Sequence, residues 1–216
     1  MNEYFQQTSS SYDALADEYI ARIYHELEHK PLDRDWLTRL AAAVGTPGPI
    51  CDMGCGPGHV ARYLHGQGAH VLGMDLSPRM IERAQQIHAD IEFRVGNMAA
   101  LDVADRSWSG IAAFYSIIHI PPTELAAVLG EFWRVLRPGG EVLLAFHVGN
   151  EIRHIDTLWE HQVTLDFLFY PRVLIEDHLR AAGFEIVKSI ERDPYEGFEV
   201  ATRRAYLHAR KPGQIF

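Results

Sequence analysis

The sequence predicts an α/β protein in which a doubly wound, mostly parallel sheet is flanked by helices. From Ile50 onwards, segments with strand-like and helical periodicity alternate along the chain. Residues 110–115 are continuously apolar, as expected for a central strand that is buried on both faces. Gly54, Gly56 and Gly58 directly follow the first strand, at the end of the sheet where open α/β folds bind ligands.

The remaining elements follow from periodicity and from turn residues. We expect helices at residues 57–67, 78–87, 122–136 and 171–182. We expect strands at residues 69–74, 91–95, 110–115, 141–146, 184–190 and 202–209. Ser77 can cap the helix that opens at Pro78, and Arg137-Pro138-Gly139-Gly140 stops the helix before it. Pro194 and Gly197 fall in a short loop, so one of the last two strands should be antiparallel.

Composition limits the classes of function. With 216 residues, 47% of them hydrophobic, the chain fits one domain. A net charge of −9 disfavours nucleic acid, and the short basic stretch Thr202-Arg203-Arg204 is interpreted as a solvated strand face. The absence of a leader-like or membrane-length apolar segment predicts a cytoplasmic protein without membrane association. Cys51 and Cys55 are too few to suggest a metal site, and none is expected.

The spacing of the glycines separates two kinds of nucleotide pocket. A dinucleotide fingerprint requires its third glycine at position 59, which is His59; the glycine comes one residue earlier, at Gly58. Asp52 precedes the loop, where a carboxylate would repel a pyrophosphate but suits an ammonium group. Asp75 ends the second strand, in the position from which an acid accepts hydrogen bonds from ribose hydroxyls. These features favour a nucleoside that carries an amino-acid tail.

Four motifs in this order resemble the class I S-adenosylmethionine-dependent methyltransferases over about residues 45–210. They are Asp52-Met53-Gly54-Cys55-Gly56-Pro57-Gly58, Asp75-Leu76-Ser77, Arg137-Pro138-Gly139-Gly140 and Ala181-Ala182-Gly183-Phe184. The resemblance implies a Rossmann-like seven-stranded sheet in the order 3-2-1-4-5-7-6, with S-adenosylmethionine as methyl donor and S-adenosylhomocysteine as product. The chain departs from the commonest family pattern at Asn97, where that pattern has an acid near the adenine.

Two further stretches are predicted to form a helical cap over the carboxyl ends of the strands. Residues 11–44 have helical periodicity, and residues 149–170 carry apolar side chains among charges. We therefore expect a single domain over residues 1–216. It consists of an amino-terminal helical cap at 1–44, a cofactor-binding core at 45–148, a cap insertion at 149–170, and a helix and β-hairpin at 171–216.

The amino-terminal helix resembles that of small-molecule methyltransferases, in which a tyrosine closes over the cofactor. Tyr12 is the first candidate and Tyr19 the second, although packing of both into a core fits the periodicity equally well. Met98 is expected to cover the adenine ring. The predicted cofactor-binding residues are Tyr12, Tyr19, Asp52, Gly54, Cys55, Gly56, Gly58, Asp75, Leu76, Met80, Asn97, Met98, Ala99 and Ser116.

Two histidines follow strands near the expected position of the methyl group. His119 and His147 are candidate catalytic bases and acceptor contacts, while hydrogen bonding to the backbone is the structural alternative. Trp159, Phe167, Phe169 and Tyr170 are the predicted apolar wall around the acceptor, or else the core of the cap. Pro121 and Pro122 lack the preceding Asn or Asp and the following aromatic residue that enzymes methylating base amines carry, which again disfavours nucleic acid.

The sequence thus predicts a methyltransferase that acts on an oxygen or nitrogen atom of a small, aromatic or hydrophobic metabolite. A non-catalytic S-adenosylmethionine-binding module, such as a sensor or an accessory subunit, is the alternative. His59 disfavours a nicotinamide-dependent oxidoreductase. The protein is expected to be a monomer or a homodimer, and the acceptor itself cannot be identified from these motifs.

Overall fold

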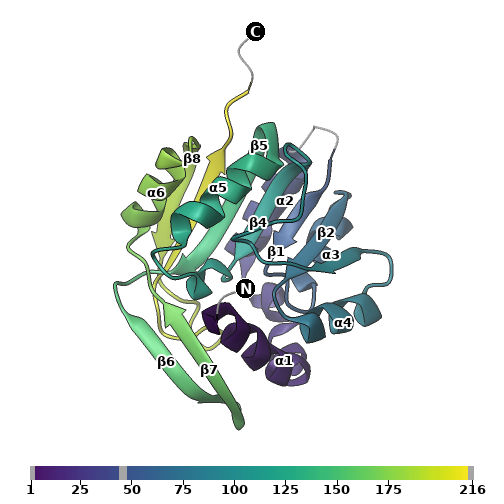
Figure 1. The fold of residues 1–216 in the computed structure, drawn as a ribbon, viewed down its shortest axis with the longest axis vertical. Coiled ribbons are helices and arrows are strands. Elements are labelled where there is room, and N and C mark those ends of the chain that lie inside the picture. Colours follow the sequence, from purple (N-terminus) through teal and green to yellow (C-terminus); the bar gives the residue numbers. More distant parts are fainter. Residues whose placement is uncertain (1–2, 44–47, 214–216) are drawn as a thin grey trace.

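The computed structural model describes residues 3–43 and 48–213 and contains a seven-stranded sheet with helices on both faces (Figure 1). The strand order is β3-β2-β1-β4-β5-β9-β8. The strands are β1 (Ile50–Met53), β2 (Val71–Asp75), β3 (Glu92–Val95), β4 (Trp108–Phe114), β5 (Leu136–His147), β8 (Glu185–Arg192) and β9 (Arg204–Arg210). Strand β9 is antiparallel to both neighbours. The predicted order is confirmed, because β6 and β7 lie outside this sheet.

Helices cover both faces of the sheet. Helices α5 (Leu125–Val135) and α6 (Arg172–Ala181) pack on one face, and α2 (Pro31–Ala43), α3 (His59–Gly66) and α4 (Pro78–Ile87) on the other. Strand β1 supplies both layers, since Cys51 and Met53 belong to the first core and Ile50 to the second. This explains the continuous apolar runs in the central strands.

The residues predicted to begin α4 and to end α5 agree with the structure to different degrees. Ser77 caps α4 by accepting a hydrogen bond from the amide of Met80 at 3.0 Å, as predicted. The segment Arg137-Pro138-Gly139-Gly140 ends α5 but already belongs to β5, which is longer than expected. The pairing of β4 with β5 shifts register there, and Gly139 has a positive φ of 81°.

The cap differs from the predicted helical cap. Its amino-terminal part is helical, with α1 (Glu3–Ile23) and the short 3-10 helix η1 (Glu26–His29) before α2. Residues 149–170 instead form an antiparallel hairpin of β6 (Ile152–Leu158) and β7 (His161–Leu168). The physical reason is a period of two, because Val163 and Leu165 are buried between more exposed neighbours.

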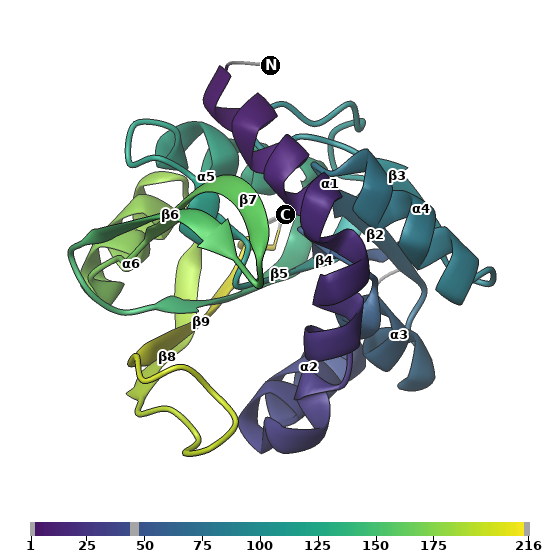
Figure 2. The same cartoon turned by 90° about the horizontal axis from the view of Figure 1, so that it is seen from below.

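Helix α1 and the hairpin are joined directly. Figure 2 shows α1 running beside β7 across the ends of the sheet strands. Ser11 on α1 donates its hydroxyl to the carbonyl of Thr164 at 3.1 Å and accepts the Thr164 amide at 2.9 Å. The side chain therefore satisfies both backbone groups of one residue in β7. None of the helices in the described ranges has the length and apolar character needed to cross a membrane.

Candidate functional site

A cavity of about 460 Å³ lies at the carboxyl ends of β1, β2, β4 and β5, where α1 and the β6–β7 hairpin line it from the cap side. Its volume is in the range of ligand sites. Most of the predicted site residues line it: Tyr12, Tyr19, Asp52, Gly54, Cys55, Gly56, Asp75, Leu76, Met80, Asn97, Met98, Ser116, His119, His147, Trp159, Phe167 and Phe169. Gly58, Ala99 and Tyr170 do not line it.

These three residues have other contacts. Gly58 has a positive φ of 83°, and a Cβ atom there would lie 2.7 Å from the ring of Phe93. The Ala99 amide donates to Oδ1 of Asn97 at 2.9 Å, which shapes the turn next to the cavity. The Tyr170 hydroxyl donates to the carbonyl of Ile120, and its side chain is buried. Tyr170 thus packs beneath the cavity wall and is not part of its surface.

The glycine loop turns tightly around the end of β2. The amides of Gly54 and Cys55 both donate to the carbonyl of Met74, at 2.7 and 3.0 Å. Gly54 has a φ of 74°, and a Cβ atom there would lie 2.3 Å from Cβ of Ser116. The Ser116 hydroxyl is buried and has no hydrogen-bond partner within the described ranges. The loop therefore brings bare backbone and an available hydroxyl to the cavity wall.

Two carboxylates hold the loop, that of the buried Asp52 and that of the partly buried Asp75. Oδ2 of Asp52 accepts the amide of Ala61 in α3 at 2.8 Å, and burial raises the pKa of Asp52 to about 7. Asp75 accepts the Gly56 amide on Oδ2 and the Ser77 amide on Oδ1, both at 2.8 Å. Burial raises the pKa of Asp75, while these amide bonds oppose the rise. Each Asp75 oxygen keeps acceptor capacity for a ligand hydroxyl.

The comparisons with known proteins agree with this geometry. Residues 50–140 match a methyltransferase domain family. The malonyl-[acyl-carrier protein] O-methyltransferase of Pseudescherichia vulneris is 30% identical over 138 residues, which cover 61% of this chain and 53% of that protein. Over these residues the resemblance to S-adenosylmethionine-dependent methyltransferases is supported. It spans about half the length of the curated relatives that it matches first.

Two solved structures cover nearly the whole chain. Magnesium protoporphyrin IX methyltransferase from Synechocystis, with S-adenosylmethionine bound, has a TM-score of 0.72 at 19% identity and covers 98% of both chains. The DhpI complex with S-adenosylhomocysteine has a TM-score of 0.75 at 20% identity and also covers 98% of both chains. At these identities the likeness shows the fold alone.

The cofactor of the family is S-adenosylmethionine, and the cavity residues fit it. The loop at Gly54 and the free Ser116 hydroxyl suit close approach of a ligand, and Asp75 can accept two ribose hydroxyls. Tyr12 and Tyr19 meet edge to face, with ring centroids 6.0 Å apart, and both line the cavity. Aromatic faces of this kind stabilise a desolvated cation such as a sulfonium.

His119 lies in the short 3-10 helix η2 (Ile117–His119), which follows β4, and is committed to two hydrogen bonds. Its Nδ1 lies 2.8 Å from the carbonyl of Asp166, and its Nε2 lies 2.6 Å from the hydroxyl of Tyr12. A carbonyl only accepts, so Nδ1 carries the proton and Nε2 accepts from Tyr12. Burial lowers the pKa of His119 to about 4. The sequence could not predict this pair, because its members are far apart in the chain.

His147 ends β5 on a second wall of the cavity. Its ring stacks on Phe169 with a centroid distance of 5.3 Å, and its Nδ1 lies 2.9 Å from the Thr202 hydroxyl. Nε2 has no hydrogen bond to any residue in the described ranges. Burial and the nearby charges of Arg204, Lys30 and Arg153 lower the pKa of His147 to about 4. The histidine is therefore neutral at physiological pH.

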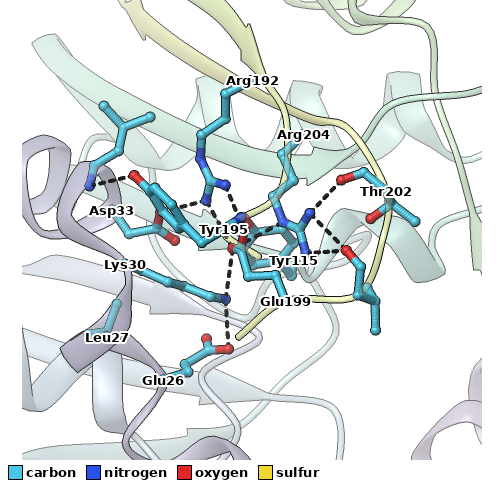
Figure 3. A network of polar contacts seen from close by, with 12 residues as sticks. Glu26, Leu27, Lys30, Asp33, Tyr115, Arg192, Tyr195, Glu199, Thr202 and Arg204 are labelled. Atoms are coloured by element: carbon cyan, nitrogen blue, oxygen red, sulfur yellow. Dashed lines mark hydrogen bonds and ion pairs between the residues drawn. The ribbon is translucent and has the colours of Figure 1, made fainter. Parts of the chain in front are cut away.

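Figure 3 shows a network of polar contacts and ion pairs that includes the cavity-lining residues Lys30, Glu199 and Arg204. The charges of these three residues act on His147. Glu199, in the loop between β8 and β9, accepts both Nη atoms of Arg192 at 2.6 and 2.9 Å and the amide of Tyr195 at 2.7 Å. Lys30 lies 3.8 Å and Nε of Arg204 3.1 Å from the same carboxylate. The network thereby connects the loop to Lys30, which directly precedes α2, and Arg192 also lies 3.4 Å from Asp33 on α2.

Several charged residues that line the cavity were not predicted as site residues from the sequence: Glu26, Lys30, Arg153, Glu199 and Arg204. The prediction that Arg204 lies on a solvated strand face was wrong, since it is 2% exposed. Its guanidinium donates to the carbonyls of Val200 and Thr202, which replaces its hydration. These charges come from separate segments, and no spacing in the chain signals that they meet.

Proposed function

We propose that this chain is an S-adenosylmethionine-dependent methyltransferase that methylates an oxygen or nitrogen atom of a small molecule enclosed in the cavity. The observation that carries the proposal is the continuity of one cavity from the glycine loop to His119 and His147. Methyl transfer depends mainly on placing an acceptor atom about 3 Å from the methyl carbon and in line with the breaking bond. A single enclosure for both reactants provides that placement.

The chain contributes enclosure and orientation. Tyr12 and His119 form one side of the cavity and Phe167 packs edge to face on His119, with ring centroids 4.9 Å apart. Trp159, at the tip of the hairpin, lies 6.0 Å from the ring of Tyr19 and closes the cavity toward α1. Bound S-adenosylmethionine supplies an activated methyl group. Since Nε2 of His119 is occupied, we assign His119 a positioning role toward Tyr12 rather than that of a free base.

The relatives support oxygen as the acceptor atom. The curated relatives with about 30% identity are named as O-methyltransferases of malonyl-[acyl-carrier protein]. One solved neighbour is named for magnesium protoporphyrin IX. The aromatic walls of the cavity are compatible with a hydrophobic acceptor body.

The test is turnover by the purified chain with S-adenosylmethionine and a panel of small acids, phenols and amines. We expect S-adenosylhomocysteine to accumulate together with an acceptor that has gained one methyl group, detected by mass spectrometry. Calorimetric binding of the cofactor without transfer to any acceptor would favour the non-catalytic module. Failure to bind the cofactor would overturn the assignment.

A further inference from the structure

The charges around the acceptor side of the cavity lead to an inference about the acceptor, which rests on the proposed function. Lys30, Arg153 and Arg204 line this side together with two carboxylates, Glu26 and Glu199, and Lys30 is paired with Glu26 at 2.7 Å. Glu199 is already held by the bidentate contact from Arg192 and by a backbone amide. The Glu199 side chain is 1% exposed, and its carboxylate is offset by ion pairs with Arg192 and Arg204.

Arg153 is the most accessible of these cations. It extends from β6, and its guanidinium lies 4.3 Å from the ring centre of Phe169, the same ring on which His147 stacks. Its Nε and Nη2 both lie against Oε1 of Glu151, at 2.7 and 2.6 Å, its Nη1 has no contact with Glu151, and its side chain is 53% exposed. A guanidinium presents several donors in a plane, so donors remain for an oxyanion beside His147. Nε2 of His147 adds a further polar group on that wall.

Neither histidine is suited to remove a proton from a neutral acceptor. Tyr12 occupies Nε2 of His119. Burial lowers the pKa of His119 to about 4. Burial also lowers the pKa of His147 to about 4, and the nearby charges of Arg204, Lys30 and Arg153 add to that effect. An imidazole with such a pKa has little affinity for a proton near neutral pH. It is therefore a weak catalyst for removing the proton of a phenol. An acceptor that is already ionised does not need one.

We propose that the acceptor is an organic oxyanion, a carboxylate, whose charged group lies between Arg153 and His147 and whose oxygen receives the methyl group. The carboxylate oxygen forms a bond to the methyl carbon as the carbon–sulfur bond breaks, and that electron pair remains on sulfur. No proton moves, and the products are a methyl ester and S-adenosylhomocysteine. The apolar part of the acceptor packs against Phe167 and Phe169.

The experiment compares acceptors of the same shape and different charge. Phenylacetate, phenylacetamide, phenol and benzylphosphonate are each offered to the protein with S-adenosylmethionine, and the gain of one methyl group by the acceptor is followed by mass spectrometry. Binding of phenylacetate to the protein loaded with S-adenosylhomocysteine is measured by calorimetry in parallel. We expect binding and transfer with the carboxylate and neither with the amide. Transfer to benzylphosphonate alone would assign the site to phosphonates and overturn the carboxylate.

Arg153→Gln and Arg94→Gln form a matched pair of variants. Arg94 in β3 pairs with Glu92 as Arg153 in β6 pairs with Glu151, which directly precedes that strand, and the exposures of the two arginine side chains are 55% and 53%. We expect Arg153→Gln to weaken phenylacetate binding about fivefold, Arg153→Lys to recover part of it, and Arg94→Gln to change nothing. Cofactor binding should stay constant in all three.

The outcomes separate this inference from the proposed function. Cofactor binding with preferential methylation of phenol, or phenylacetate binding that is insensitive to Arg153→Gln, overturns the oxyanion while the methyltransferase stands. Loss of cofactor binding in the unaltered protein overturns both. With a carboxylate acceptor we expect kcat not to rise between about pH 8 and 9, above the pKa of Asp52, because no base has to take a proton from the acceptor.

Discussion

The Tyr12 hydroxyl donates a hydrogen bond to Nε2 of His119 at 2.6 Å, across the cavity wall between α1 and η2. The second nitrogen, Nδ1, donates to the Asp166 carbonyl of the hairpin at 2.8 Å. One imidazole therefore links three elements of the site: the cap helix, the end of β4 and strand β7. Its tautomer is fixed by the carbonyl, and the orientation of the Tyr12 phenol follows from it.

Removal of this hydroxyl should reduce turnover more than it reduces stability. We expect Tyr12→Phe to lower kcat about tenfold or more, because the ring next to the reacting groups loses its fixed position, and to cost about 1 kcal/mol of unfolding free energy. Tyr24→Phe is the matched control, since Tyr24 lies 3.1 Å from Nε2 of His88 and neither residue lines the cavity. Equal effects of the two variants on kcat would contradict the role of Tyr12.

The buried histidine predicts how stability depends on pH. The folded-state pKa of His119 is about 4, below its ordinary value of 6.5, so between these values the unfolded chain binds a proton that the folded chain does not. Its contribution is fully present above about pH 6.5 and is lost as the pH falls toward 4. His119→Asn should remove up to about 3 kcal/mol of this dependence, measured by urea unfolding at a series of pH values. An unchanged slope would show that the histidine is solvated.

The glycine loop should tolerate no side chain at Gly54. Gly54→Ala introduces a Cβ atom 2.3 Å from Cβ of Ser116, at a residue whose φ is 74°. We expect cofactor binding to weaken at least about tenfold and the free energy of unfolding to fall by about 1 to 3 kcal/mol. Gly130→Ala is the control. Gly130 lies inside α5 with nothing within 4 Å of an added Cβ, so that variant should gain about 0.5 to 1 kcal/mol. Calorimetry measures the cofactor affinity of Gly54→Ala and Gly130→Ala, and thermal unfolding measures their stability.

Local signals account for the parts of the site that the sequence predicted. The glycine loop and Asp75 are defined by backbone conformation and by position at a strand end, which residue type and spacing report directly. The strand order followed from the family resemblance and is confirmed. The positions of Tyr12 and Tyr19 on the cavity wall agree with the periodicity of α1.

The parts that depend on long-range contacts were not predictable. The pairing of Tyr12 with His119, and the convergence of Lys30 and Arg204 on Glu199, join segments with no relation in spacing. The hairpin at residues 149–170 is a different case, because the alternation of Val163 and Leu165 was visible. It was outweighed by the expectation that a cap over such a sheet is helical.

Calorimetric titration with S-adenosylhomocysteine tests the central claim, a nucleoside site built on the glycine loop and Asp75. We expect one binding site in the unaltered protein. Asp75→Asn should weaken binding about tenfold or more, because a carboxylate that accepts hydroxyl and amide hydrogens becomes an amide. Asp90→Asn, at the surface, should leave the affinity unchanged. NADH should not bind. Binding of NADH, or equal affinity for S-adenosylhomocysteine in the protein and in Asp75→Asn, would contradict the account.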